Sequence, residues 1–243
     1  MNTHNNNIIE KALWKTSRNL TRDYSELELL QSGNRTQEKF VERSIRKTKE
    51  ILARELEVLN ASLQFDDEPH KIEKDGLHIL IRPIDGVNNL LRAVSLFATT
   101  VVQIERKDQQ NKVISAIIAF PVLNSIYKAE LGQGAWVQTY EESGTISGKR
   151  LRVSKISEPS LSIISTTNNI PYSNYFDTRN FGCTAFDIAH YASGKIDTII
   201  VKPEDQIHKF AIEIFAKESG GVIRDFESQY ILATNPFLAS FIK

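Results

Sequence analysis

Residues 79–91 read I-L-I-R-P-I-D-G-V-N-N-L-L, and the rest of the chain is organised around this stretch. Its three apolar residues at the start are typical of the end of a buried strand. Pro83 then removes a backbone donor and favours an extended residue before it. Asp85 and Gly86 are turn residues, because an aspartate side chain bonds nearby backbone and glycine tolerates a positive φ. The stretch therefore predicts a strand, a sharp turn and a helix from Leu90 onward, capped by one of the two asparagines.

A corner of this kind has two chemical uses. The free backbone N–H groups at the start of a helix point outward, where an anion such as phosphate can bind. The carboxylate of Asp85 at the same corner can hold a divalent metal. The alternative is an ordinary turn with Asp85 as its cap, and the D-G pair taken alone favours that alternative.

The bulk composition restricts the classes of protein to consider. The chain has 243 residues, with 30 Lys and Arg, 30 Asp and Glu, and 41% hydrophobic residues. A neutral chain of this size predicts two subdomains that share a cleft, with no direct nucleic-acid signal and no membrane segment. We place the boundary in the polar stretch 141–149, between an N-terminal α+β subdomain (1–140) and a C-terminal α/β subdomain (150–243). The single cysteine excludes an internal disulfide, and a cytoplasmic protein is expected.

Hydrophobic periodicity predicts different arrangements in the two halves. In the first half, apolar residues at helical spacing predict a helix near 8–20 and a second one from Thr36, whose charged residues form a solvated face. Runs rich in β-branched residues then predict an antiparallel sheet of hairpin strands at 97–106, 112–120, 125–131 and 135–139. The second half alternates strands at 161–166, 196–201, 222–223 and 231–233 with helices at 184–193 and 206–219.

Several short motifs follow one another in a recognisable order. The stretch I-R-P-I-D-G-V-N-N at 81–89 resembles the signature D-P-[IL]-D-G-T-T-N of the inositol monophosphatase family. Later segments resemble other motifs of that family, namely G-x-G-A at 132–135, G-S-A-A-x-D-L-A at 182–189, G-R-x-D at 194–197, P-W-D at 203–205 and E-A-G-G at 218–221. The chain is similar to this family, in its bacterial inositol-1-monophosphatase and extragenic-suppressor forms, over nearly its whole length after Thr36.

The resemblance implies a fold, a reaction and partners. The fold is a layered α-β-α-β-α sandwich of the α+β class, with an antiparallel N-terminal sheet. The reaction is Mg²⁺-dependent hydrolysis of a phosphomonoester, with an inositol or sugar phosphate as the ligand. The family also implies a homodimer, and some bacterial relatives combine this fold with a role in RNA synthesis.

The resemblance assigns site residues one by one. The metal ligands are Asp85, Asp205 and Asp66, the last with a side chain one methylene shorter than the family's glutamate. Arg82 stands where the family has a metal-binding aspartate, and Val87 stands where it has the threonine that positions the attacking water. Asp66 and the altered position Val87 are therefore the candidate catalytic residues. The candidate residues for binding the phosphate and substrate are Gly86, Val87, Asn88, Gly182, Cys183 and Thr184.

The arginine at position 82 changes the expected chemistry. A guanidinium about 4 Å from a divalent ion repels it by roughly 8 kcal/mol at an effective dielectric constant near 20. We therefore expect Arg82 to form an ion pair with Asp85, Asp66 or Asp205 in place of the metal. The histidines at 70, 78, 190 and 208 show no ligand spacing and are interpreted as surface or core residues, and Cys183 as a small buried residue.

Two function classes remain open. The first is a Mg²⁺-dependent phosphatase of this family whose activity is weak or lost. The second is a non-catalytic member that binds a phosphorylated ligand or a protein partner, with a regulatory role linked to RNA synthesis.

Overall fold

The computed structural model describes residues 2–29, 34–67, 71–140, 146–166, 177–201, 206–226 and 230–241. Within these ranges, no helix has the length and apolar character needed to cross a lipid bilayer. The predicted site residue Asp205 and the acidic loop beyond Asp67 lie outside the described residues, as does part of the predicted subdomain boundary at 141–149.

Two long helices pack against each other along one side of the molecule. Helix α1 spans Asn2–Leu29 and α2 spans Asn34–Leu56, and a short 3-10 turn, Glu57–Leu59, follows. Their apolar residues recur at three- and four-residue spacing, which gives each helix one stripe to bury. That stripe includes Leu13 of α1 and Leu52 of α2, both completely buried. Both predicted helices are therefore present. Helix α1 extends beyond the predicted residues 8–20 at both ends, and α2 begins two residues before Thr36.

The first sheet contains seven strands in sequential order, β1-β2-β3-β4-β5-β6-β7. They span Ser62–Phe65, Gly76–Asp85, Ala98–Lys107, Gln110–Phe120, Ser125–Glu130, Gly134–Tyr140 and Ile146–Arg150. All neighbouring strands are antiparallel, as predicted, except that β1 pairs with β2 in parallel. Strand β7 extends this sheet to Arg150, and the division of the chain at 141–149 stays a prediction.

The second half forms a smaller mixed sheet with two helices. Its strands β8, β9, β10, β11 and β12 span Ile163–Thr166, Asp177–Arg179, Thr198–Val201, Val222–Phe226 and Tyr230–Thr234, in the order β11-β12-β10-β8-β9. Helix α4 spans Thr184–Ala192 and α5 spans Gln206–Ser219. The pairs β10–β8 and β8–β9 are parallel, which fits the alternation of strands and helices predicted for this half.

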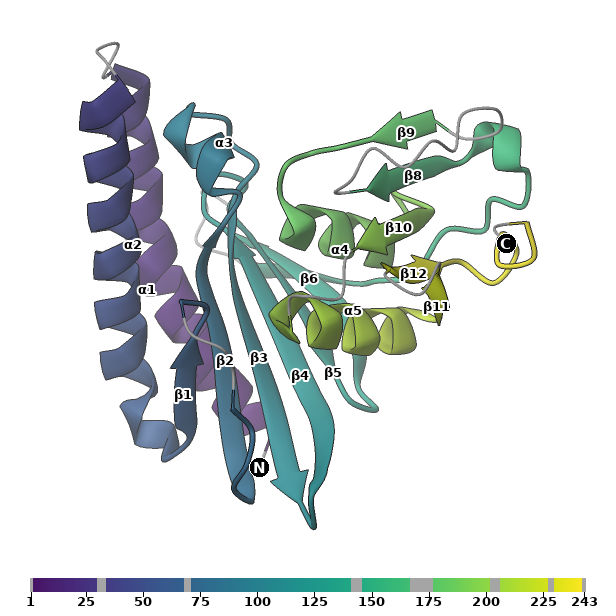
Figure 1. Cartoon of the computed structure of the whole chain (residues 1–243), viewed down its shortest axis with the longest axis horizontal. Helices are drawn as coiled ribbons and strands as arrows, with labels where there is room; N and C mark the ends of the chain where they lie inside the picture. Colours follow the sequence, from purple (N-terminus) through teal and green to yellow (C-terminus); the bar gives the residue numbers. More distant parts are fainter. Residues whose placement is uncertain are drawn as a thin grey trace.

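The elements stack in layers (Figure 1). Helices α1 and α2 cover one face of the seven-stranded sheet, α4 and α5 cover its other face, and the five-stranded sheet lies beyond them. One apolar core joins the first sheet to α4, α5 and the second sheet, and another joins it to α1 and α2. This is the predicted α+β layered fold. The predicted outermost helical layer, beyond the second sheet, has no α-helix among the described residues.

Two glutamate–glycine contacts tie the layers together. The carboxylate of Glu218, at the end of α5, accepts the backbone N–H groups of Gly132 and Gly134, each at 2.9 Å. These residues belong to the E-S-G-G and G-Q-G-A segments. Glu218 follows Gly132 by 86 residues and Gly134 by 84 residues in the sequence. Gly134 has φ +87°, a left-handed backbone conformation that favours glycine. The two motifs thus hold α5 against the β5–β6 hairpin.

Candidate functional site

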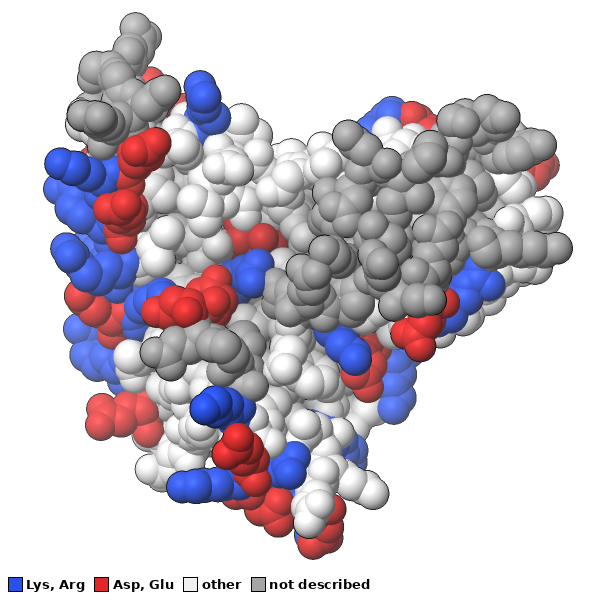
Figure 2. All heavy atoms as spheres, in the orientation of Figure 1, with Lys and Arg blue, Asp and Glu red and all other residues white. Residues whose placement is uncertain are grey.

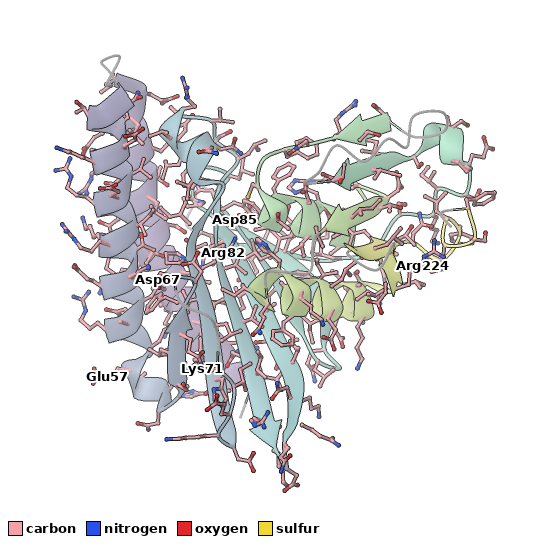
Figure 3. The ribbon with its side chains drawn as sticks, viewed as in Figure 1. Glu57, Asp67, Lys71, Arg82, Asp85 and Arg224 are labelled. Carbon is pink, nitrogen blue, oxygen red and sulfur yellow. The ribbon has the colours of Figure 1, made fainter. Side chains whose placement is uncertain are left out.

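The end of strand β2 is irregular, and this irregularity shapes the candidate site. Side chains three positions apart on a regular strand point to opposite faces. The pairing of β2 with β3 shifts between Arg82 and Asp85, so one stretch of β2 has extra residues. A shift of this kind re-aims the side chains beside it. It lets the Arg82 guanidinium approach to 3.9 Å from the Asp85 carboxylate (Figure 3).

The predicted ion pair of Arg82 is present. Its Nε lies 3.4 Å from Oδ2 of Asp66, in the turn after β1, and its Nη1 lies 3.9 Å from Oδ1 of Asp85. The Arg82 and Asp66 side chains are 22% and 25% exposed, so solvent screens this pair only partly. Burial raises the pKa of Asp66 above its usual value, although Arg82 and Lys49 oppose that shift. One guanidinium therefore lies within salt-bridge range of two of the predicted metal ligands.

The Asp85 carboxylate is surrounded by donors. Its Oδ1 accepts the N–H of Gly86 at 3.0 Å, and its Oδ2 accepts the N–H of Ala185 at 2.6 Å and Nε2 of His208 at 3.0 Å. Burial alone would raise the pKa of Asp85, but His208, the Ala185 amide and Arg82 together lower it below its usual value. The buried carboxylate is therefore kept ionised by protein groups on three different elements.

Both predicted phosphate-binding segments meet at this corner. Gly86 has φ +76°, and a Cβ there would lie 3.1 Å from Cβ of Cys183 and 2.8 Å from the Leu96 carbonyl oxygen. The side chain of Asn89 donates to the carbonyl oxygens of Leu96 and Phe181, at 2.7 and 2.8 Å. The structure thus brings residues 86–88 and 182–184 side by side, and only glycine fits at the first of these positions.

The predicted helix after the turn is shorter and begins earlier. Helix α3 spans Val87–Leu91, with Gly86 in the left-handed conformation as the residue before it. The predicted asparagine cap is wrong, because no side chain caps this helix and Asn89 instead bridges two loops. A side chain that can reach two carbonyl groups satisfies both its donors there, which a cap would not do.

Two further groups lie buried near the site. Cys183 is 1% exposed, and burial together with the nearby Asp85 raises the pKa of its thiol well above the usual value. It is the small buried residue that was predicted, not a reactive thiol. Asp187, in the first turn of α4, accepts the Ser165 hydroxyl at 2.7 Å, and burial raises its pKa to about 7. These groups support the corner without facing solvent.

The described residues do not fit the magnesium ion that the resemblance implies. A carboxylate has about four lone-pair positions, and those of Asp85 already face two amide groups, His208 and Arg82. Asp66 lies next to a guanidinium, which repels a divalent ion. Within the described parts of the chain, no three acidic, histidine or cysteine side chains are placed to hold a metal.

Sequence reasoning found most of this corner and missed one residue. Arg82, Asp66 and Asp85 come together as expected, whereas the predicted approach of Asp205 to Asp85 concerns a residue outside the described ranges. The interpretation of His208 as an ordinary histidine overlooked its bond to Asp85, 123 residues away. One signal was present in the sequence, because His208 follows a predicted metal ligand by three residues, one helical turn.

Comparison with known proteins now identifies the family. The model of the inositol monophosphatase family matches residues 3–240. This chain belongs to the inositol monophosphatase family. Inositol-1-monophosphatase from Rhizobium meliloti is 26% identical over 239 residues, which cover 91% of this chain and 85% of that protein. Nus factor SuhB from Escherichia coli is 27% identical over 170 residues, covering 64% of this chain and 60% of that protein.

Solved structures of family members share the fold. Extragenic suppressor protein suhB from Bartonella henselae superposes with a TM-score of 0.77 at 23% identity, covering 97% of this chain and 96% of that one. The IMPase of Thermotoga maritima also reaches 0.77, at 19% identity, covering 100% of this chain and 95% of that one. These superpositions cover 97% or more of this chain, so it has the family fold.

Proposed function

We propose that this member of the inositol monophosphatase family binds a phosphorylated small molecule, such as an inositol or sugar phosphate, and has lost most or all Mg²⁺-dependent hydrolysis. The observation that carries the proposal is the position of Arg82, 3.4 Å from Asp66 and 3.9 Å from Asp85. The family signature has an aspartate there. Here a cation stands in place of one ligand and lies within salt-bridge range of Asp66 and Asp85. It would repel a divalent metal ion by roughly 8 kcal/mol at about 4 Å and an effective dielectric constant near 20.

The position after the D-G pair supports the same conclusion. Val87 is 38% exposed and has no hydroxyl with which to hold an attacking water. Valine has nearly the shape of threonine, so the backbone is kept while the hydrogen bond is lost. Relative to the family signature, residues 82–87 thus lack both a metal-binding carboxylate and the hydroxyl that positions the attacking water.

An arginine at this corner retains affinity for phosphate. A guanidinium offers two parallel N–H groups to an oxyanion and makes charge-assisted hydrogen bonds with it. Arg82 is 22% exposed, so a ligand can reach it from solvent. Binding without hydrolysis is therefore the function that these residues support best.

The test restores the family residues. The double variant Arg82→Asp, Val87→Thr is compared with wild type, with Arg92→Asp as a control for an equal charge change on an exposed arginine near the same loop. We expect wild type to release little or no phosphate from inositol-1-phosphate with millimolar Mg²⁺ and to bind that ligand without metal in a calorimeter. The double variant gains a Mg²⁺-dependent rise in Tm, and the control gains none.

A clear result would contradict this proposal. If wild-type protein hydrolyses inositol-1-phosphate with Mg²⁺ and Asp85→Asn abolishes that turnover, the chain is a divergent phosphatase.

From the resemblance we also infer that the protein is a homodimer and that it is located in the cytoplasm. Light scattering would test the first inference, and cell fractionation would test the second.

A further inference from the structure

The outer face of α2 carries a row of cations that the candidate site does not use. At about 100° per residue, Lys39, Arg43, Arg46, Lys47 and Arg54 lie on one side of the helix, interrupted by Glu50 alone. We call these five residues the basic stripe. Buried residues of α2, among them Val41 and Leu52, lie on the opposite side. The stripe therefore faces away from the fold, over about 22 Å of helix.

Figure 2 shows the same feature on the surface. Lys and Arg side chains follow one another along the outer edge of the molecule, where Figure 1 places α2, with some Asp and Glu side chains between them. The chain as a whole is neutral, with 30 basic and 30 acidic residues. The stripe is thus a local excess of charge, not a consequence of a basic composition.

Intramolecular ion pairs leave part of the stripe uncompensated. Arg46 lies 3.9 Å from Glu50, and Arg54 lies 3.2 Å from Glu55. Lys39, Arg43 and Lys47 have no carboxylate within 4.0 Å in the part of the chain that the structure describes. These three follow one another at four-residue spacing, where like charges destabilise a helix. Acidic side chains lie near these three cations, but none of them forms an ion pair within 4.0 Å with Lys39, Arg43 or Lys47 among the described residues.

A hollow runs beside the stripe between α1 and α2. Its volume is about 450 Å³, and its lining includes Arg43 and Lys47 of the stripe together with Arg22 of α1. Its wall also holds the Phe40 ring, with the Arg43 guanidinium 5.2 Å from the ring centre. Asp23 lies buried in it and accepts the Ser44 hydroxyl at 2.8 Å. The surface thus combines cations, an apolar wall and a few carboxylates.

We propose that the basic stripe and this hollow form a docking surface for an acidic segment of another protein. Carboxylates along such a segment would pair with Lys39, Arg43 and Lys47, and an apolar side chain between them would lie against Phe40. The carboxylates of Asp23, Glu26 and Glu50 in the same hollow repel a continuous phosphate chain, whereas a protein segment of mixed charge can pair with them. These acids favour a protein over a nucleic acid. The proposal does not depend on the function proposed for the Arg82 corner.

The test uses a labelled acidic peptide of about ten residues, mostly glutamate with one leucine and one lysine, which is long enough to follow the stripe when extended. Fluorescence anisotropy measures its binding to the full chain at about 0.05 M salt, and again at higher salt. The variant removes three charges, Lys39→Ala, Arg43→Ala and Lys47→Ala. The control removes three exposed lysines elsewhere, Lys107→Ala, Lys112→Ala and Lys217→Ala.

We expect the stripe variant to weaken binding at least tenfold, and the control less than twofold. The melting temperature of the stripe variant should equal or exceed that of wild type, because the three substitutions relieve like-charge repulsion within α2. Absence of binding of the acidic peptide by wild type, or an equal loss in the control, would overturn the proposal. Tighter, stripe-dependent binding of an oligouridylate of equal charge would also overturn it and assign the surface to nucleic acid.

Discussion

The corner around Asp197 and the corner around Asp85 hold their carboxylates in different ways. Asp197 is 5% exposed and accepts the Ser154 hydroxyl and, at 2.7 Å, the N–H of Ile163. Both partners belong to the surrounding framework, and the carboxylate only stabilises the fold. Asp85 is similarly buried, at 7%, but its partners include the charged Arg82 and the histidine of α5.

Acidic residues in the family motifs of this chain are therefore of two kinds: those that join elements of the fold, and those at the corner around Arg82. Two residues that join elements bond only uncharged donors: Glu218 accepts two backbone N–H groups, and Asp197 accepts one hydroxyl and one backbone N–H. At the Asp85 corner, a cation and a valine stand where the family signature has a carboxylate and a hydroxyl. Asp85 itself has become a contact between the two halves of the molecule. Protein donors on several elements thus satisfy this buried carboxylate.

The largest expected effect tests the framework corner. Asp197→Ala should reduce the free energy of unfolding by about 3 kcal/mol, because it leaves a buried amide and a hydroxyl without an acceptor. Urea denaturation measures the change. Asp197→Asn keeps the shape and one acceptor and should lose clearly less; equal losses for the two variants would mean that packing, not hydrogen bonding, is responsible.

The second prediction uses the buried carboxyl of α4. Burial raises the pKa of Asp187 to about 7, against 3.8 for an exposed aspartate. The folded state thus keeps a proton that the unfolded chain loses, so this group's stabilisation is complete below about pH 4 and is lost as the pH rises to 7. Asp187→Asn should remove the part of this loss that falls between pH 5 and pH 8, which is on the order of 2–3 kcal/mol. Urea midpoints at pH 5 and pH 8 measure it, and parallel slopes for both proteins would contradict it.

The third prediction concerns the cation of the altered corner. Arg82→Ala should destabilise the protein by about 1–2 kcal/mol, less than for a fully buried pair because Asp85 keeps its other donors and solvent reaches Asp66. Millimolar Mg²⁺ should partly rescue this variant and change the wild-type Tm little. If Mg²⁺ raises the Tm of wild type by several degrees and raises the Tm of the variant by no more than that, Arg82 does not replace the metal.

The smallest expected effect distinguishes the two carboxylates beside Arg82. The pKa of Asp66 is raised by burial, so at pH 7 the folded state disfavours its charge and Asp66→Asn should change stability by less than about 0.5 kcal/mol. The pKa of Asp85 is lowered, so its stabilisation is present above pH 3.8 and lost below it, and Asp85→Asn should destabilise clearly at pH 7. Thermal melts of both variants at pH 7 compare them; similar losses would refute the contrast.

Much of the architecture follows from local pattern. The spacing of apolar residues predicted α1, α2, α4 and α5, and alternating β-branched runs predicted most strands of both sheets. The D-G turn predicted the left-handed Gly86 correctly, because only glycine takes that conformation at low cost. The asparagine cap was wrong, since the helix begins at Val87 and Asn89 lies inside its first turn, where its side-chain amide donates to two loop carbonyl groups.

The sequence by itself determined the family fold, the altered residues Arg82 and Val87, and the expectation of an ion pair at position 82, because motifs and charges are local properties of the chain. Only the tertiary structure decided how Asp85 is held. Its partners Ala185 and His208 lie 100 and 123 residues away, and packing of α4 and α5 against the first sheet brings them into contact. The shift in the β2–β3 pairing likewise decided that Arg82 and Asp85 approach each other, since an unbroken strand would have pointed them to opposite faces.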